Sequence, residues 1–254
     1  MHLARHTTTT LGDSLDSAEV ALLPTGSVEQ HGPALPLGTD FMAAEAVADA
    51  VADRDDVVCL PTLPVGVSEH HRQFDGTLWT DPETFEDYVS DVLSSMASHG
   101  VRKAVIVNGH GGNTDAITRA ARRLRRNETA FAAPWNWWSN LEGLDAELFG
   151  QAGIGHADEV ETSMVMHIQG DLVREENLEE AEDGAADSWG KSVHGANVGF
   201  DTADFSESGA VGHPTSGSPG AGKQLFEKAT DELDALVDWL SETQFEALLP
   251  EGHR

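Results

Sequence analysis

The amino-acid sequence predicts an α/β fold with three layers, α/β/α, in which helices cover both faces of a mainly parallel β-sheet. Two observations predict this fold. Short apolar runs of strand length, bounded by proline, glycine or asparagine, alternate along the chain with longer segments of helical periodicity. Strands and helices in strict alternation are typical of parallel sheets, because each helix carries the chain back to the same edge of the sheet.

Four apolar runs are the expected strands: Val20–Leu23, Val57–Leu60, Lys103–Val107 and Thr129–Ala132. Four segments are the expected helices: residues 40–53, 82–99, 114–126 and 221–247. In the second helix, Asp81 is a candidate N-cap, Pro82 occupies the first position and Gly100 follows the end. We therefore expect a single domain over residues 1–254, with a polar, acidic and loop-rich insertion at 170–222.

The charge of the chain excludes one class of partner. The 44 acidic and 15 basic residues give a formal net charge of -29, spread along the whole chain. This excess predicts adaptation to a salt-rich, halophilic cytoplasm and repels nucleic acid. No segment has the length of a membrane span, and no signal peptide is evident, so we expect a cytoplasmic protein without a membrane partner. Cys59 is the single cysteine, which excludes an internal disulfide and a thiolate metal site.

Unusual polar residues follow two of the expected strands. The segment GSVEQHGPALPLGTD carries Glu29, His31 and Asp40 directly after the first strand, and NGHGGN carries His110 after the third. In parallel sheets the ligand site lies where strands end and helices begin. NGHGGN alone could also be a tight turn that binds an anion, or an esterase-type oxyanion loop, although the chain has no G-x-S-x-G nucleophile motif.

A third cluster, GHADEVETSMVMH at residues 155–167, is expected to start a helix just after His156. On such a helix His156 and Glu159 share one face, whereas Glu161 lies about 200° round from Glu159. We therefore expect Glu159 to be a metal ligand and catalytic carboxylate, and Glu161 to orient a ligand from behind, with Glu161 as the alternative ligand. The acidic residues could instead only complement the helix dipole.

Together the three clusters predict a metal centre with Glu29, His31, Asp40, His110 and Glu159 as ligands. Nitrogen and oxygen donors without thiolate suit zinc, manganese or iron, and a carboxylate such as Asp40 can bridge two ions. Such a centre would lower the pKa of water from ~15.7 toward ~7 and so provide a nucleophile.

The motifs TGSVEQHGPALPLGTD, NGHGGN and GHADEVETS, in this order, resemble the creatininase (creatinine amidohydrolase) family over roughly residues 20–170. The segment GTLW with the preceding His71 and Phe74 resembles the F-P-G-T segment of that family. The resemblance implies a creatininase-like fold and a homohexamer. It also implies a hydrolase of non-peptide C–N bonds in small-molecule amides, with divalent metal ions that often number two per subunit.

By motif position, the resemblance implies metal ligands at Glu29, His31, Asp40 and His110 and a catalytic histidine at His156. Two positions depart from the family. Creatininases have N-G-H-x-E-N where this chain has Gly112 in place of the glutamate, and they carry a glutamate where this chain has Gly155.

These departures leave the substrate open. Creatinine and other cyclic amides are one class, and the formamidopyrimidine ribonucleotide that related archaeal deformylases cleave in flavin and deazaflavin synthesis is another. The remaining alternative is a non-enzymatic scaffold that is stabilised by metal and binds a small molecule. The aromatic run with Trp135, Trp137 and Trp138 is expected either to line the pocket or to lie at a subunit interface.

Overall fold

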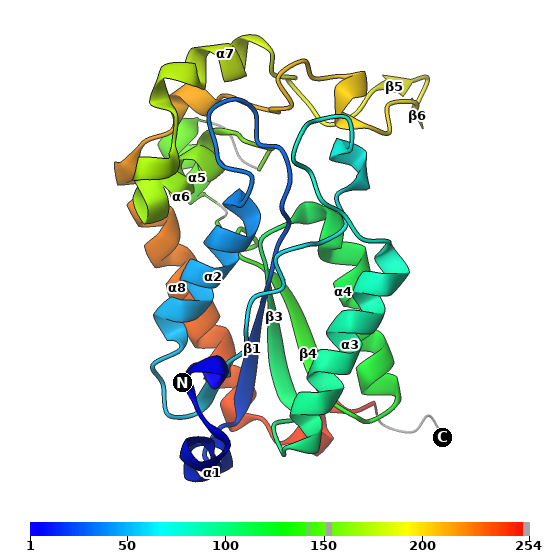
Figure 1. The fold of residues 1–254 in the computed structure, drawn as a ribbon, viewed down its shortest axis with the longest axis vertical. Coiled ribbons are helices and arrows are strands. Elements are labelled where there is room, and N and C mark those ends of the chain that lie inside the picture. Colours follow the sequence, from blue (N-terminus) through cyan, green and yellow to red (C-terminus); the bar gives the residue numbers. More distant parts are fainter. Residues whose placement is uncertain (142, 151–153, 251–254) are drawn as a thin grey trace.

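The computed structural model describes residues 1–141, 143–150 and 154–250, and it confirms the predicted fold class (Figure 1). Four parallel strands form the sheet in the order β2-β1-β3-β4. The strands are β1 (Val20–Thr25), β2 (Val57–Cys59), β3 (Lys103–Asn108) and β4 (Phe131–Asn136). Strand β4 begins at Phe131, two residues later than expected, and continues to Asn136, which pairs with Asn108.

Helices cover both faces of this sheet (Figure 1). On one face lie α2 (Thr39–Val51), α6 (Glu159–Gln169) and α8 (Pro219–Glu242). On the other lie α3 (Pro82–Ser98) and α4 (Thr114–Arg126). Neighbouring strand residues alternate between the two cores, since successive side chains of a strand point to opposite faces. Leu22 and Val107 pack against α2 and α8, whereas Leu23 and Ile106 pack against α3 and α4.

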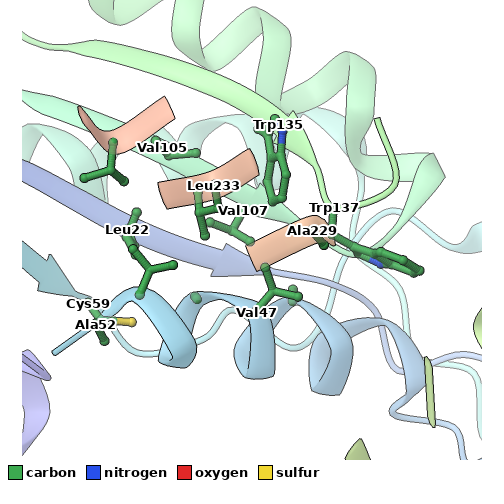
Figure 2. Close-up of a cluster of buried hydrophobic side chains, with 14 of the residues drawn as sticks. Leu22, Val47, Ala52, Cys59, Val105, Val107, Trp135, Trp137, Ala229 and Leu233 are labelled. Carbon is green, nitrogen blue, oxygen red and sulfur yellow. The ribbon is translucent and has the colours of Figure 1, made fainter. Parts of the chain in front are cut away.

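Two of the tryptophans belong to the first of these cores. Figure 2 shows Trp135 and Trp137 beside Val107 and Ala229. Trp137 is only 1% exposed and Trp135 9%. Both side chains therefore contribute apolar packing between the end of β4 and α8.

The remaining elements are short. They are α1 (Thr8–Asp16), α5 (Leu144–Phe149), α7 (Leu178–Asp183), the hairpin β5 (Ser192–Val193) and β6 (Ala196–Asn197), and 3-10 turns at Leu3–Arg5, Glu69–His71, Gly111–Asn113, Gly170–Leu172, Glu175–Asn177, Thr202–Asp204, Pro214–Ser216 and Phe245–Leu248. The acidic segment at 170–222 thus contains α7 and the hairpin, which lie above the sheet in Figure 1. None of the helices in the described ranges is sufficiently long and apolar to span a bilayer.

An amide network holds the loops at the carboxyl edge of the sheet. Thr25 Oγ1 donates to Asn108 Oδ1 (3.1 Å), and Asn108 Nδ2 donates to Asn136 Oδ1 (2.8 Å). Asn113 Nδ2 donates to the Gly26 carbonyl (3.1 Å), which ties the loop after β3 to the loop after β1. The loops that carry the predicted site residues are therefore fixed relative to each other.

The opposite edge of the sheet contains a buried lysine. Lys103 Nζ, at the start of β3, donates to the carbonyl groups of Leu240 (2.9 Å), Ser241 (3.1 Å) and Thr243 (3.2 Å) at the end of α8. It also lies 2.9 Å from Glu19 Oε2. A cation at a helix C-terminus satisfies the last carbonyl groups and the negative end of the helix dipole.

We expect Lys103→Met to lower the free energy of unfolding by about 2 kcal/mol, because it leaves buried carbonyl groups without a donor. Urea denaturation in molar potassium chloride, followed by tryptophan fluorescence, measures this. The matched control is Lys228→Met, which removes an i,i+4 pair with Glu232 on the surface of α8 and should cost less than about 0.5 kcal/mol. Equal losses in the two variants would contradict the role given to Lys103.

Candidate metal centre

The structure brings four of the predicted ligands together. Glu29, His31, Asp40 and His110 are between 0 and 4% exposed. His31 Nε2 lies 3.0 Å from Asp40 Oδ1, and His110 Nδ1 lies 3.1 Å from Asp40 Oδ2. His110 Nδ1 also lies 3.2 Å from Glu29 Oε1. The two oxygens of Asp40 thus face different histidines.

The loop after β1 and the loop after β3 can approach closely because of a glycine. Asp40 lies in the first turn of α2, and Gly109 follows the end of β3. A Cβ atom on Gly109 would lie 2.0 Å from the Asp40 carbonyl oxygen, which no side chain tolerates. The NGHGGN motif therefore places His110 beside Asp40 through close backbone packing.

Backbone contacts determine which nitrogen of each histidine carries the proton. His31 Nδ1 lies 3.1 Å from the Glu29 carbonyl oxygen, and His110 Nε2 lies 2.9 Å from the Val67 carbonyl oxygen. A carbonyl oxygen can only accept, so in the neutral imidazoles these nitrogens are the protonated ones. The lone pairs of His31 Nε2 and His110 Nδ1 then face carboxylate oxygens.

Several atoms at this place lack a hydrogen-bond partner within the described residues. They are both carboxylate oxygens of Glu29, Oδ2 of Asp40 and Nε2 of His31. Lone pairs that face carboxylates repel each other, and buried charges without partners are costly. A cation between these atoms removes both problems, and the side-chain chemistry therefore fits a metal ion.

The third cluster differs from its prediction. Helix α6 begins at Glu159, with Asp158 as an extended N-cap whose side chain accepts from the Val160 and Glu161 N–H groups. His156 precedes the helix, so the helical-phase argument that paired it with Glu159 does not apply. Glu159 Oε2 instead accepts from the backbone N–H of His213 (2.9 Å).

Glu161 occupies the position that we expected for Glu159. Glu161 Oε2 lies 3.6 Å from His31 Nε2, and it accepts from the Ala157 N–H (2.6 Å). His31, His156 and Glu161 form a group whose potential ligand atoms all lie within 4.8 Å of one another, and Glu159 belongs to no such group in the described part of the chain.

His156 is held at the wall of the centre by backbone pairing. Its N–H donates to the Val211 carbonyl (2.9 Å), and Nε2 lies 2.8 Å from the Gln30 carbonyl oxygen. Nε2 therefore carries the proton, and Nδ1 faces the cluster at 3.7 Å from Glu29 Oε1. Burial, with the nearby His31, holds the pKa of His156 well below its ordinary value, so this imidazole is neutral at pH 7.

His71 is a functional candidate that the sequence identified only through the F-P-G-T resemblance. The Gln30 amide oxygen accepts from the Gly32 N–H, so the Gln30 nitrogen must be the donor to His71 Nδ1 (2.8 Å). The proton of His71 is then on Nε2, 3.4 Å from Glu29 Oε1. His71 Nε2 and Glu29 Oε1 face each other without a hydrogen bond, and with His156 they form another group of potential ligand atoms within 4.8 Å of one another.

The carboxylates change the proton affinity of the histidines between them. Burial lowers the pKa of His31, but Asp40 and Glu161 outweigh burial and raise it to about 10. Burial also opposes protonation of His110, yet Glu29 and Asp40 hold the pKa of that imidazole well above its ordinary value. Burial raises the pKa of Glu161 to about 8. Without metal, protons therefore supply the cationic charge.

A cavity of about 450 Å³ opens beside the centre. Its lining includes Glu29, Asp40, His70, His110, Trp138 and Trp189. Trp138 is thus the one member of the expected aromatic run that reaches this cavity in the described residues. Trp189 comes from the acidic segment, where no periodic pattern marked it, and its ring lies 5.8 Å from that of His156.

The two glycines that depart from the creatininase motifs are closed to side chains. A Cβ atom on Gly112 would lie 2.2 Å from the Val67 carbonyl oxygen and 2.4 Å from His110 Nε2. A Cβ atom on Gly155 would lie 1.9 Å from the Val211 carbonyl oxygen. The backbone at both places is therefore built for glycine, and other residues must supply any carboxylate.

Comparison with known proteins identifies the family of this chain. Residues 4–237 match the family model described as creatininase, creatinine amidohydrolase. A mycofactocin precursor peptide peptidase of Mycolicibacterium smegmatis is 35% identical over 87% of this chain and 85% of its own. The creatinine amidohydrolase of Pseudomonas putida is 29% identical over 61% and 66%. A formamidopyrimidine deformylase of Methanothermobacter marburgensis is 36% identical over 39% and 43%.

Solved structures show the same fold. A crystal structure of creatinine amidohydrolase has a TM-score of 0.82 at 23% identity and covers 96% of this chain and 98% of its own. A manganese form of creatininase has a TM-score of 0.81 at 22% identity and covers 95% and 99%. From the match over nearly its whole length, this chain belongs to the creatininase family of amidohydrolases.

Proposed function

We propose that this chain is a hydrolase of amide C–N bonds that uses two divalent metal ions, with zinc, manganese or iron as the candidates. One observation carries the proposal. Buried carboxylate oxygens and imidazole lone pairs face one another at 3.0–3.2 Å without a proton to share in their neutral histidine forms. Such a set of nitrogen and oxygen donors is suited to these cations.

The donors divide into two sets that share one carboxylate. Glu29, Asp40 and His110 form one set, and His31, Asp40 and Glu161 form the other. With neutral histidines the three carboxylates carry three buried negative charges. One divalent ion leaves the site with a net negative charge. Two divalent ions make its net charge positive, which favours binding of an anionic group beside them.

A pair of divalent ions there would polarise a carbonyl group and make water available as hydroxide near neutral pH. The residues of the chain supply the proton transfers. His156 is neutral and its Nδ1 faces the centre, so it can accept a proton and return it to the nitrogen that leaves as the C–N bond breaks. The Gln30 carbonyl group holds His156 in place.

The substrate class is proposed from the relatives. The mycofactocin precursor peptide peptidase aligns over most of both chains, whereas the creatinine amidohydrolase and the deformylase align over shorter parts. A cavity of about 450 Å³ lies within the range that holds drug-sized ligands. We therefore place a peptide-derived amide first, ahead of a cyclic amide and a formamide. We also propose that the chain assembles into a homohexamer, as the family resemblance implies.

Glu161→Gln should lower the metal content from about two ions per chain to about one, because the amide is a far weaker ligand than the carboxylate. Glu159→Gln is the matched control, since its carboxylate accepts from His213 outside the cluster, and it should keep the full content. Elemental analysis after gel filtration in molar potassium chloride measures both. If only the Glu159→Gln variant loses metal, Glu159 and not Glu161 is the metal ligand.

The metal-free protein should become less stable as pH rises. A raised folded-state pKa means that the stabilisation is complete below the unfolded value and disappears as pH passes the folded value. For His31 that window runs from 6.5 to about 10, and for Glu161 from 4.5 to about 8. Between pH 6 and 9 the Tm of chelator-treated protein should therefore fall by at least about 3 °C relative to metal-loaded protein.

Thermal melts in molar potassium chloride at several pH values test this dependence. Salt is needed because the net charge of -29 requires screening. In His31→Gln the metal-free melts should lose the part of the pH dependence that His31 contributes, whereas the part that Glu161 and His110 contribute should remain. Parallel curves for metal-free and metal-loaded protein would contradict the exchange of protons for metal at this centre.

Metal-loaded protein should hydrolyse a short peptide amide at least about 10-fold faster than creatinine or a formamidopyrimidine ribonucleotide. Mass spectrometry of the products measures this. His156→Ala should keep its metal but lose at least about 100-fold in turnover, the scale of general acid–base catalysis. If metal-loaded protein binds one of these three compounds without cleaving it, the non-enzymatic scaffold is favoured instead.

A further inference from the structure

One histidine in the cavity wall has no bonding partner. His70 lies in the 3-10 turn Glu69–His71 and lines the cavity together with His110 and His156. Within the described residues it makes no hydrogen bond or ion pair, and it belongs to none of the convergent ligand groups. Neither ring nitrogen is thus engaged by another described residue.

The neighbouring histidines differ in this respect. Each of His71, His110 and His156 has one nitrogen bonded to the protein, and the other nitrogen directed at a carboxylate of the centre. The His70 ring stacks over that of His110, with centroids 5.8 Å apart and planes 12° apart. His70 is thus next to the centre without being part of it.

The turn that carries His70 is firmly attached to the rest of the molecule. Ser68 Oγ accepts from Ser27 Oγ (2.7 Å) and donates to the Leu78 carbonyl (2.9 Å). On the other side of the turn, Arg72 makes two hydrogen bonds of 2.6 Å to the carboxylate of Asp201. A donor on such a support needs little rearrangement when a ligand arrives.

The cavity wall also contains two glycines at places where the creatininase motifs carry glutamates. Gly112 and Gly155 both line the cavity, and neither has room for a side chain. His70 lines the same cavity and has ring nitrogens that no other described residue engages.

We infer that His70 contacts the substrate and donates a hydrogen bond from its ring N–H to the carbonyl oxygen of the amide that is cleaved. This inference rests on the proposed function. The bond strengthens as negative charge develops on that oxygen, while His156 handles the proton that goes to the leaving nitrogen. His70 acts here as a neutral donor and exchanges no proton.

The experiment compares His70→Phe with His70→Gln, because phenylalanine keeps a ring without a donor and glutamine restores an N–H group. His70→Phe should keep the full metal content, lose about 100-fold in kcat and change KM by less than about 3-fold. His70→Gln should recover at least about 10-fold of that loss. The matched control is His99→Phe, an exposed residue after α3 that should leave kcat unchanged.

A second readout needs no turnover. Acetohydroxamate is a small chelating anion for metal centres, and His70→Phe should weaken its binding to manganese-loaded protein about 10-fold in calorimetry. If wild-type protein cleaves no amide, the proposed function fails. The ratio of acetohydroxamate affinities of wild-type and His70→Phe protein then tests alone whether His70 contacts a ligand in the cavity. A weaker affinity or a lower kcat at full metal content supports the inference. The inference is overturned if neither kcat nor the acetohydroxamate affinity changes, or if His70→Phe loses metal.

Discussion

The arrangement at the carboxyl edge of the sheet depends on one electrostatic constraint, which is that buried carboxylates need positive charge. Glu29, Asp40 and Glu161 have lost their hydration, and the protein supplies no lysine or arginine in ion-pair contact with them within the described residues. Only protons or metal ions can fill that role here. The histidines are accordingly fixed by backbone carbonyl groups with their lone pairs turned inward.

The two helical layers contribute unequally to this arrangement. Asp40 and Glu161 come from α2 and α6, which pack together on one face of the sheet, whereas His110 reaches the centre from the loop before α4 on the other face. The amide network around Asn108 joins these parts. The distance between Asp40 and Glu161 thus depends on the packing of α2 and α6 over the sheet.

Much of this could be predicted from the sequence. Glu29, His31, Asp40 and His110 were identified because polar residues after apolar strands meet at one edge of a parallel sheet. Glu159 was preferred to Glu161 because it shares a helix face with His156, but the N-cap at Asp158 leaves His156 outside the helix, so that preference has no basis in the structure. His70 and Trp189 were missed, because neither the turn at Glu69–His71 nor the segment around Trp189 has a period from which orientation can be inferred, and His71 was found only through the family resemblance.

The closed backbone at Gly112 and Gly155 limits how this cavity could be redesigned. A glutamate at either place would force the new Cβ atom into the carbonyl oxygen of Val67 or Val211, so one substitution would disturb the fold without adding a usable carboxylate. A carboxylate can be added to this wall only together with a shift of the segment that faces the glycine.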